Sequence, residues 1–266
     1  MPKGCFSTMI RQLSGVAQST FLTEAQLEPM RISDPADCFP DQKRCRVHFE
    51  CDMMQIFSLK LAKIPMNASL VQLYGYIAAR DYLDSSLNYI VNRSRDNPLM
   101  GSLIEMTGPK RGITMTSPVL VEYDMRIKKG EQEEYDLQLI DGATDFCEVT
   151  TPSHPFTSRI NGDCGAVDIT LAHVVNAVEA TIDVIVSEVR SGFNLSLSLY
   201  VFVGGSYQGI ELLCDIIGES CVITRRYVIA VEMDSWMHLK LKVGQEGSKY
   251  GERHCRFKAN LHEFAR

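Results

Sequence analysis

Apolar and polar residues alternate with a period of two along four segments of the chain. In residues 119–127 every second residue is apolar, and charged residues stand at most of the positions between them. The same alternation recurs in residues 178–186, 195–203 and 237–243. Successive side chains of a β-strand point to opposite faces of the sheet, so each segment predicts a strand with one buried face and one solvent-exposed face.

Shorter apolar runs predict further strands. They cover residues 46–51, 55–61, 72–79, 102–106, 134–140, 166–172, 208–214, 219–224, 226–233 and 253–261. Turn signals separate many of them: Gly108-Pro109, Gly130, Asp141-Gly142, Asn161-Gly162, Gly204-Gly205 and Gly244. The spacing of apolar residues in 83–91 is helical instead, and 168–178 fits a strand or a helix. Because no helices of 10–15 residues fall between the strands, we predict an all-β fold, an antiparallel β-sandwich with at most one or two short helices.

The first 45 residues differ from the rest in their pattern of apolar and polar residues. They show no sustained period and contain Pro2, Pro29, Pro35 and Pro40. The sequence therefore predicts a flexible N-terminal tail over residues 1–45 and one β-sandwich domain over residues 46–266. The length of 266 residues and the apolar content of 45% suit a folded domain of this size.

The cysteines and the apolar runs bear on location. There are nine cysteines and no Cys-x-x-Cys pair, a pattern that favours reduced thiols over a disulfide framework or a structural zinc site. No run of 18 apolar residues predicts a membrane span, and residues 1–23 lack the apolar core of a secretory signal. We expect a cytoplasmic protein that is not secreted, with an organelle-targeting peptide as the alternative for residues 1–23.

The charge balance bears on the partner. The formal net charge is −6, and the acidic and basic residues of the first 45 residues cancel, so the excess of acid belongs to the body. An acidic body disfavours binding to phosphate backbones, although it does not exclude a local basic patch. We therefore expect a protein partner, with nucleic acid disfavoured except for the ribosome. The sequence leaves the oligomeric state open.

One stretch has a dense mixture of charges, and it is the first candidate binding site. It contains Arg80, Asp81, Asp84, Arg93, Arg95 and Asp96. The three aspartates could form an oxygen-rich rim for calcium. The alternative is a set of Arg–Asp ion pairs that fixes a loop over the sheet, and the three arginines among the carboxylates favour it.

A second candidate is the turn of residues 108–112. Lys110 and Arg111 lie between Gly108-Pro109 and Gly112, and such a turn could offer two cations and backbone amides to a phosphate. The spacing of a nucleotide-binding loop is absent. A plain connection between two strands explains the same residues.

Several motifs in order carry a resemblance to a known family. They lie in residues 73–84, 88–90, 92–96, 107–113, 122–124 and 177–182, and the resemblance covers about residues 46–262. The chain resembles a plant domain of unknown function that is abundant in grasses. The resemblance implies a β-sandwich and supplies no catalytic residues. In some members a similar domain follows a ribosome-inactivating rRNA N-glycosylase domain, which implies a stress or defence setting by association.

Catalytic and metal-binding motifs are missing from the sequence. The Glu-x-x-Arg pair of an N-glycosidase is considered at Glu28 and Arg31, which flank Pro29, where a rigid helix is disfavoured. No Gly-x-Ser-x-Gly or His-Glu-x-x-His is present. We therefore expect no catalytic residues, cofactor or metal, and predict a non-enzymatic interaction or regulatory module. The alternatives are rRNA N-glycosylase activity, or an accessory role in it, and a calcium- or phospholipid-binding sandwich.

Overall fold

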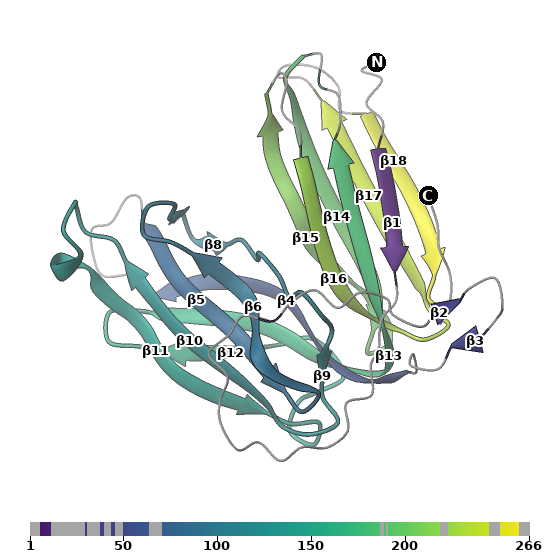
Figure 1. The fold of residues 1–266 in the computed structure, drawn as a ribbon, viewed down its shortest axis with the longest axis horizontal. Coiled ribbons are helices and arrows are strands. Elements are labelled where there is room, and N and C mark those ends of the chain that lie inside the picture. Colours follow the sequence, from purple (N-terminus) through teal and green to yellow (C-terminus); the bar gives the residue numbers. More distant parts are fainter. Residues whose placement is uncertain are drawn as a thin grey trace. The chain divides into compact units, whose positions relative to one another are not determined.

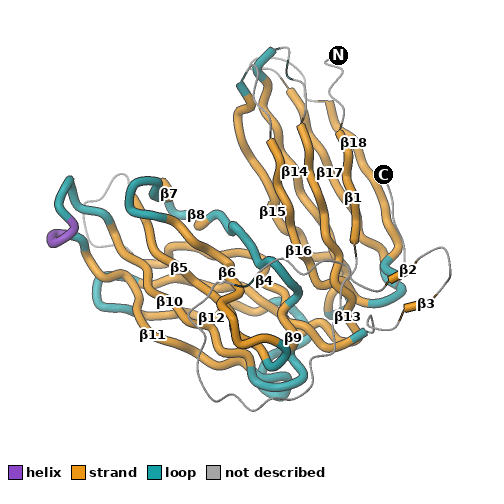
Figure 2. Tube along the Cα trace, viewed as in Figure 1, coloured by secondary structure: helices purple, strands orange, loops and turns teal. Residues whose placement is uncertain are grey.

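The computed structural model describes residues 6–11, 30, 38–39, 44–45, 50–63, 71–186, 189, 191–218, 223–244 and 251–260. Strands make up about 68% of it and helix about 2%, with antiparallel sheets throughout, which confirms the all-β prediction (Figure 1). One 3₁₀ turn, η2 (Glu133–Tyr135), is drawn in purple in Figure 2. Among the described residues no helix has the length and apolar character needed to cross a bilayer.

The described strands form two compact units. The strands of unit 2 are β4 (Cys51–Lys63), β5 (Gln72–Asp81), β6 (Asp84–Arg93), β7 (Leu99–Met100), β8 (Leu103–Ile104), β9 (Ile113–Thr114), β10 (Val119–Ile127), β11 (Leu137–Phe146) and β12 (Phe156–Asn161). Those of unit 1 are β1 (Phe6–Arg11), β2 (Cys38–Phe39), β3 (Arg44–Cys45), β14 (Phe193–Val203), β15 (Ser206–Ile217), β16 (Ile223–Glu232), β17 (Trp236–Gly244) and β18 (Gly251–Lys258). The long strand β13 (Ala166–Val186) contributes its first part to unit 2 and, from Val174 on, its second part to unit 1.

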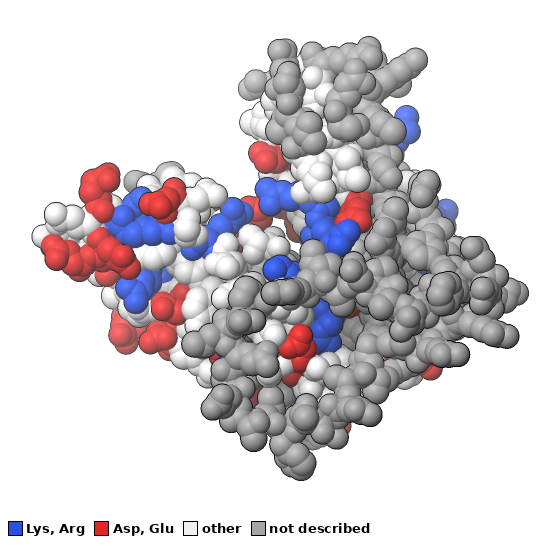
Figure 3. Space-filling view, viewed as in Figure 1, with Lys and Arg blue, Asp and Glu red and all other residues white. Residues whose placement is uncertain are grey.

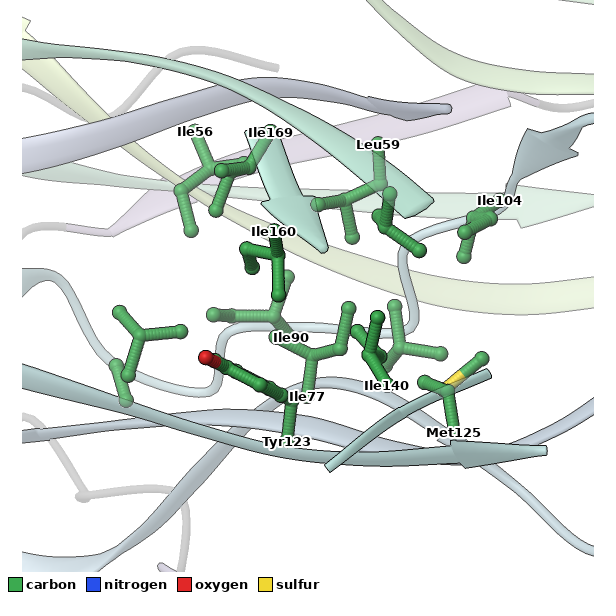
Figure 4. Close-up of a cluster of buried hydrophobic side chains, with 14 of the residues drawn as sticks. Ile56, Leu59, Ile77, Ile90, Ile104, Tyr123, Met125, Ile140, Ile160 and Ile169 are labelled. Carbon is green, nitrogen blue, oxygen red and sulfur yellow. The ribbon is translucent and has the colours of Figure 1, made fainter. Parts of the chain in front are cut away.

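Unit 2 is a sandwich of two sheets. One sheet contains β12, the first part of β13, β4, β8 and β9, and the other has the order β11-β10-β5-β6, with β7 beside β5. Figure 4 shows aliphatic side chains of the first sheet, among them Ile56, Leu59 and Ile169, facing Ile77 and Met125 of the second. These side chains are buried, and burying apolar area is the main favourable term in folding.

Unit 1 has two larger sheets and a two-stranded sheet of β2 and β3. The second part of β13 pairs with β1 and β16, and the other sheet has the order β15-β14-β17-β18. Every second residue of β14, from Phe193 to Val203, is buried, as the alternation in residues 195–203 predicts. The residues between them, such as Ser196 and Ser198, lie on the outer face of this sheet.

The helical interpretation of residues 83–91 is wrong, because residues 84–91 belong to β6 and Leu83 lies in the turn before it. The register with β5 shifts between Ile77, which faces Val91, and Ala78, which faces Tyr89. This β-bulge leaves Ile90 without an opposite residue, and Ile90 and Val91 are both fully buried. A bulge breaks the period of two, so the apolar positions took on a spacing that resembled a helix.

The turn expected at Asp141-Gly142 is also wrong, because both residues lie inside β11. Gly142 has a φ of 139° and faces Tyr123 of β10. The Tyr123 ring lies over it, with Cε2 3.6 Å from the place where a β-carbon would stand. Glycine here leaves room for an aromatic ring on the neighbouring strand, so it belongs to the sheet and not to a turn.

The polar side of residues 178–186 is buried, although the alternation predicts a solvent-exposed face. Glu179, Thr181 and Asp183 are each less than a tenth exposed. Asp183 accepts two hydrogen bonds from the guanidinium of Arg226 on the neighbouring strand β16, at 2.6 and 3.0 Å. Burying a charged side chain costs much less free energy when an opposite charge is hydrogen-bonded to it. The alternation of apolar and polar residues does not reveal such a partner.

Most of the predicted tail lies outside the described residues, so its flexibility stays a prediction. Within it, β1 pairs antiparallel with β13, from Phe6 opposite Val186 to Arg11 opposite Thr181. The division of residues 46–266 into two units was not indicated by the sequence, because strands of both units alternate in the same way.

Gly75 provides a test of the β5–β10 pairing. Its φ is 112°, and a β-carbon there would overlap the backbone oxygen of Asp124 and lie 3.0 Å from Cα of Met125. Gly101 has a similar φ of 97°, but open space surrounds its missing β-carbon. We expect Gly75→Ala to lower the free energy of unfolding by more than about 3 kcal/mol and Gly101→Ala by about 1–2 kcal/mol, because only the first adds a clash to the backbone strain. Chemical denaturation measures both, and equal losses would contradict the pairing.

Candidate functional site

The charged residues predicted as one cluster divide into separate ion pairs within unit 2. Arg80 pairs with Glu122 at 2.6 Å, Arg111 with Asp81 at 2.5 Å and Arg95 with Asp136 at 2.7 Å. Arg93 pairs with Glu105. Asp81 and Arg111 are the only two predicted residues that the described part of the structure joins in an ion pair. The other three carboxylates were not in the predicted set.

Arg80 and Glu122 connect two neighbouring strands. Both project from the outer face of the sheet, Arg80 from β5 and Glu122 from β10. Nε of Arg80 donates to Oε1 of Glu122, and a second guanidinium nitrogen donates to the backbone oxygen of Ser85 in β6. Arg80 is 8% exposed, so its guanidinium is largely removed from solvent. Its hydrogen bonds connect β5 with both neighbouring strands, β10 and β6.

Asp81 organises the end of the β5–β6 hairpin and the turn after Gly108. Its Oδ1 accepts from the backbone amide of Leu83 at 3.0 Å and from Arg111, and its Oδ2 accepts from the amide of Thr114 at 2.9 Å. Asn88 adds a second connection, because its side chain accepts from the amide of Lys110 and donates to the carbonyl of Arg111, both at 2.8 Å. Both carboxylate oxygens of Asp81, one of the three aspartates of the calcium hypothesis, are therefore already used by donors.

The turn of residues 108–112 is held against the sheet by its backbone. The Gly108–Pro109 peptide bond is cis, and the amide of Gly108 donates to the carbonyl of Ile90 at 3.1 Å. A β-carbon on Gly108 would overlap the carbonyl oxygen of Tyr89. Nζ of Lys110 donates to the carbonyl of Met30 at 2.9 Å. Both cations of the proposed phosphate turn therefore have partners within the protein.

Arg95 and Asp136 form a third centre, near η2. The Asp136 side chain is 0% exposed and accepts from Arg95, from the hydroxyl of Tyr74 at 2.7 Å and from the amide of Lys129 at 2.7 Å. These donors, Arg95 first, hold the pKa of Asp136 well below its ordinary value. Acidic and basic side chains are interspersed at this end of unit 2, on the left in Figure 3.

The two remaining aspartates of the predicted set lie apart from these centres. Asp84 is half-buried and accepts from the amide of Ser86 at 2.8 Å, as in a turn. Asp96 is exposed in the loop after β6 and pairs with no described residue. Among the described residues no group of three or more His, Cys, Asp and Glu is placed to hold a metal ion. The geometry thus favours the ion-pair interpretation of this stretch over the calcium rim.

A different surface gathers binding chemistry, on the outer face of the β15-β14-β17-β18 sheet in unit 1. Tyr200 of β14 faces His238 of β17, which in turn faces Arg256 of β18. Trp236, two residues before His238, faces Lys258. We call this surface the aromatic–basic face, and it comprises Tyr200, Phe202, Tyr207, Trp236, His238, Lys240, Lys242, Arg256 and Lys258.

Some rings of the aromatic–basic face are in contact with one another, and three of its rings are open to solvent. Phe202 and Tyr207 meet edge to face with ring centroids 5.5 Å apart, and Tyr207 meets His238 at 4.7 Å. Tyr200 lies over Gly209, whose missing β-carbon would stand 3.3 Å from its Cε1. Tyr200, Tyr207 and Trp236 are 37%, 47% and 48% exposed. The contacts with Phe202 and His238 hold the ring of Tyr207 in place, and part of the surface of each of the three tyrosine and tryptophan rings stays accessible.

Cations lie beside the rings on β17 and the edge strand β18. Glu252 is held by Lys240 at 2.8 Å and by His254 at 2.7 Å, and these contacts lower its pKa. Lys258 pairs with Asp234 at 2.8 Å. Lys242 and Arg256 have no ion-pair partner among the described residues. Burial first, and then the positive charges of Arg256 and His254, lower the pKa of His238, so its ring is neutral at pH 7.

We compared the sequence with models of protein families. The model of a domain of unknown function, DUF6598, matches residues 53–265. The chain belongs to this family. The resemblance to a family of unknown function is thereby confirmed, while the plant origin and the association with an rRNA N-glycosylase stay predictions. Comparisons of the DUF6598 chain with curated proteins and with solved structures gave no match.

The aromatic–basic face was missed in the sequence of this DUF6598 domain, although a signal was present. In residues 194–202 the outward positions change from Asn and Ser to Tyr200 and Phe202. Aromatic residues at the solvent positions of a clean alternation indicate an exposed apolar surface. The alignment of Trp236 with Lys258 depends on a register that the sequence does not give.

The ion pairs of the predicted site allow a direct comparison. Arg80 and Glu122 are 8% and 23% exposed, whereas Glu105, the partner of Arg93, is 44% exposed. We expect Arg80→Ala to lower the free energy of unfolding by about 2–4 kcal/mol, because it leaves a partly buried carboxylate unpaired. Arg93→Ala should cost about 1 kcal/mol or less. Urea denaturation measures both, and a larger loss for Arg93→Ala would refute this ranking.

Asp136 predicts a pH dependence of stability. Its pKa is lower in the folded protein than in the unfolded chain, so its contribution is complete above about pH 4–5 and is lost as the pH falls toward the folded pKa. The drop in melting temperature between pH 6 and pH 3 should therefore be smaller in Asp136→Asn than in the wild type. Asp96→Asn is the control and should keep the wild-type drop. A wild-type drop in Asp136→Asn would exclude this role.

Proposed function

We propose that this DUF6598 protein is a non-enzymatic interaction module that binds a negatively charged partner on the aromatic–basic face of unit 1. The observation that supports the proposal is the arrangement of three exposed rings and four cations on one face of one sheet. Side chains of Tyr, Trp and Arg are enriched where proteins bind partners, because they offer large contact area together with polar groups.

The excess of positive charge on the aromatic–basic face favours a partner with negative charge. Lys240, Lys242, Arg256 and Lys258 stand against Glu211 and Glu252 on the outward positions of this sheet. The whole chain has a formal net charge of −6, so this local excess of cations opposes the overall balance. Positive potential that is concentrated on one surface speeds the encounter with an anionic partner and fixes its orientation.

The residues predicted as a binding site support this choice by contrast. Arg80, Arg95 and Arg111 each have a carboxylate partner at 2.7 Å or less inside unit 2. An external ligand would have to displace those contacts and leave a carboxylate unpaired, which costs free energy. Lys242 and Arg256 need no such exchange, because no described carboxylate pairs with them.

The sequence also led to more specific predictions about the partner, the location and the biological setting. A protein partner, a cytoplasmic location and a stress or defence setting in plants stay predictions. The calcium alternative has no supporting geometry at Asp81, whose oxygens accept from backbone amides and Arg111. The Glu28–Arg31 pair considered for N-glycosylase activity lies outside the described residues.

Trp236 provides the test, because it is the only tryptophan of the chain and lies on the proposed surface. We expect saturable changes in its emission on titration with at least one of three anionic probes: heparin, poly-L-glutamate or a single-stranded 12-mer of deoxythymidine. Neutral dextran should cause none. The change should weaken as salt is raised, since the attraction is electrostatic.

The matched variants are Lys242→Glu and Lys129→Glu. Both alter the net charge equally, but Lys129 is an exposed residue of unit 2. Lys242→Glu should weaken binding about tenfold or more at low salt, and Lys129→Glu by less than about twofold. No response to any of the three anions, or an equal response to dextran, would exclude the proposed function.

A further inference from the structure

We infer that the partner of the aromatic–basic face is a single-stranded nucleic acid. This inference rests on the proposed function and deepens it, because it names the chemical class of the anion. Four features of the face carry the argument: the order of rings and cations across the strands, the accessibility of the rings, the position of all these residues on one side of one sheet, and the contrast with the sheet of unit 2.

The register places a cation at the end of each row of rings. One row runs across the sheet from Tyr200 through His238 to Arg256. In the neighbouring row Phe202 and Tyr207 lie on β14 and β15, and Trp236 is followed by Lys258 on β18. Residues two positions apart on a strand are separated by about 7 Å, so the rows are neighbours. The rings lie on β14, β15 and β17, and Arg256 and Lys258 lie beyond them on the edge strand β18, much as the bases of a single strand lie to one side of its phosphates.

The rings offer surfaces on which bases can stack. Three of them are more than a third exposed, and one of the three, Tyr207, meets Phe202 and His238 edge to face. The low pKa of His238 keeps its ring neutral at pH 7, where it can join the aromatic surface. Stacking on aromatic side chains beside a cationic groove is the general means by which proteins hold single strands without regard to sequence. A face of this size accommodates two or three bases.

The shape of the surface favours a single strand over a duplex. The major groove of B-DNA admits a helix or a two-stranded ribbon, and bases inside a duplex offer no faces for stacking. The outward residues here lie on four adjacent strands of one sheet, at neighbouring positions of the same register. Such a surface contacts a duplex through few phosphates, but it can contact both the bases and the phosphates of a single strand.

An acidic protein partner fits the same surface less well. Carboxylates could meet Lys242 and Arg256, but a carboxylate side chain carries no ring of its own to stack on Tyr200, Tyr207 or Trp236. The excess of cations is small, and charge alone would give weak, salt-sensitive binding. A ligand that combines a planar ring with each negative charge can contact both the rings and the cations of the face.

The β11-β10-β5-β6 sheet of unit 2 is an internal contrast. Its outer face also carries tyrosines, Tyr76 and Tyr89, whose rings meet edge to face with centroids 5.8 Å apart. Around them lie Glu122, Asp124 and Asp141. Arg80 and Arg126 pair with Glu122 and Asp124, so the cations beside these tyrosines are already occupied by acids. Rings alone therefore do not make a nucleic-acid site, and the predicted binding is confined to the aromatic–basic face.

The experiment is a titration of the full chain with fluorescein-labelled single-stranded deoxythymidine 12-mer, followed by anisotropy and by Trp236 emission. Both signals should report the same dissociation constant. Its logarithm should depend linearly on the logarithm of the salt concentration, with a slope that corresponds to about two to four phosphate contacts. A double-stranded 12-mer should compete at least tenfold more weakly.

Two variants separate stacking from charge. Tyr200→Ser removes a ring and should weaken binding on the order of tenfold without a change in the salt slope. Arg256→Glu should weaken binding and lower the slope by about one or more, while Lys129→Glu should leave both unchanged. Circular dichroism and melting temperature verify that each variant folds before its affinity is compared.

The outcomes separate the inference from the proposed function. If heparin or poly-L-glutamate changes Trp236 emission and the 12-mer does not, the inference is overturned and the proposed function stands. If the 12-mer binds but Tyr200→Ser binds it as well as the wild type, stacking is absent and the inference is overturned. If no anion binds, both are excluded. Weaker binding by Tyr200→Ser and Arg256→Glu, with Lys129→Glu unaffected, supports the inference.

Discussion

Antiparallel pairing determines the role of nearly every side chain in this protein. When two strands pair in a fixed register, a residue and its partner point to the same face, and the next residues along both strands point to the other. Burying Leu195, Leu197 and Leu199 of β14 therefore places Ser196, Ser198 and Tyr200 outward together. The same register brings Tyr200 beside His238 and His238 beside Arg256. A shift of one residue would bury the charges and expose the core.

The two units apply this constraint to charge in opposite ways. In unit 2, outward arginines face carboxylates on neighbouring strands or loops, as with Arg80 and Glu122, and the resulting pairs fix hairpins and turns. In unit 1, cations on β17 and β18 outnumber the carboxylates of the same face, and aromatic rings occupy the positions beside them. The first arrangement stabilises the protein's own chain. The second arrangement leaves cations and aromatic rings accessible to a partner, and this is the basis of the proposed function.

The strands were predictable from sequence to the extent that their period is regular. Residues 119–127 and 195–203 alternate without interruption, and the structure has β10 and β14 there. The prediction failed where a local feature breaks the period, as at the bulge around Ile90 or at Gly142, which makes room for Tyr123. It also failed where a distant residue pairs with a buried charge, since nothing near Asp183 in the sequence indicates Arg226.

The candidate site was less predictable for the same reason. Nearness in sequence grouped Arg80, Arg93 and Arg95, but their partners Glu122, Glu105 and Asp136 come from other segments, up to 42 residues away. Asp81 and Arg111 were both named, yet only the fold joins them. The aromatic–basic face draws on four strands between residues 193 and 258, and its members meet only through the register.

Photocrosslinking tests the central claim most directly, because it identifies the residues that touch a bound strand. A single-stranded 12-mer that contains 5-iodouridine would be irradiated in complex with the full chain, and the crosslinked peptides identified by mass spectrometry. The account predicts adducts on Tyr200, Tyr207 or Trp236, which lie on the outer face of one sheet. Crosslinks confined to Tyr76 and Tyr89 of unit 2, or spread without preference over exposed aromatic residues, would contradict it.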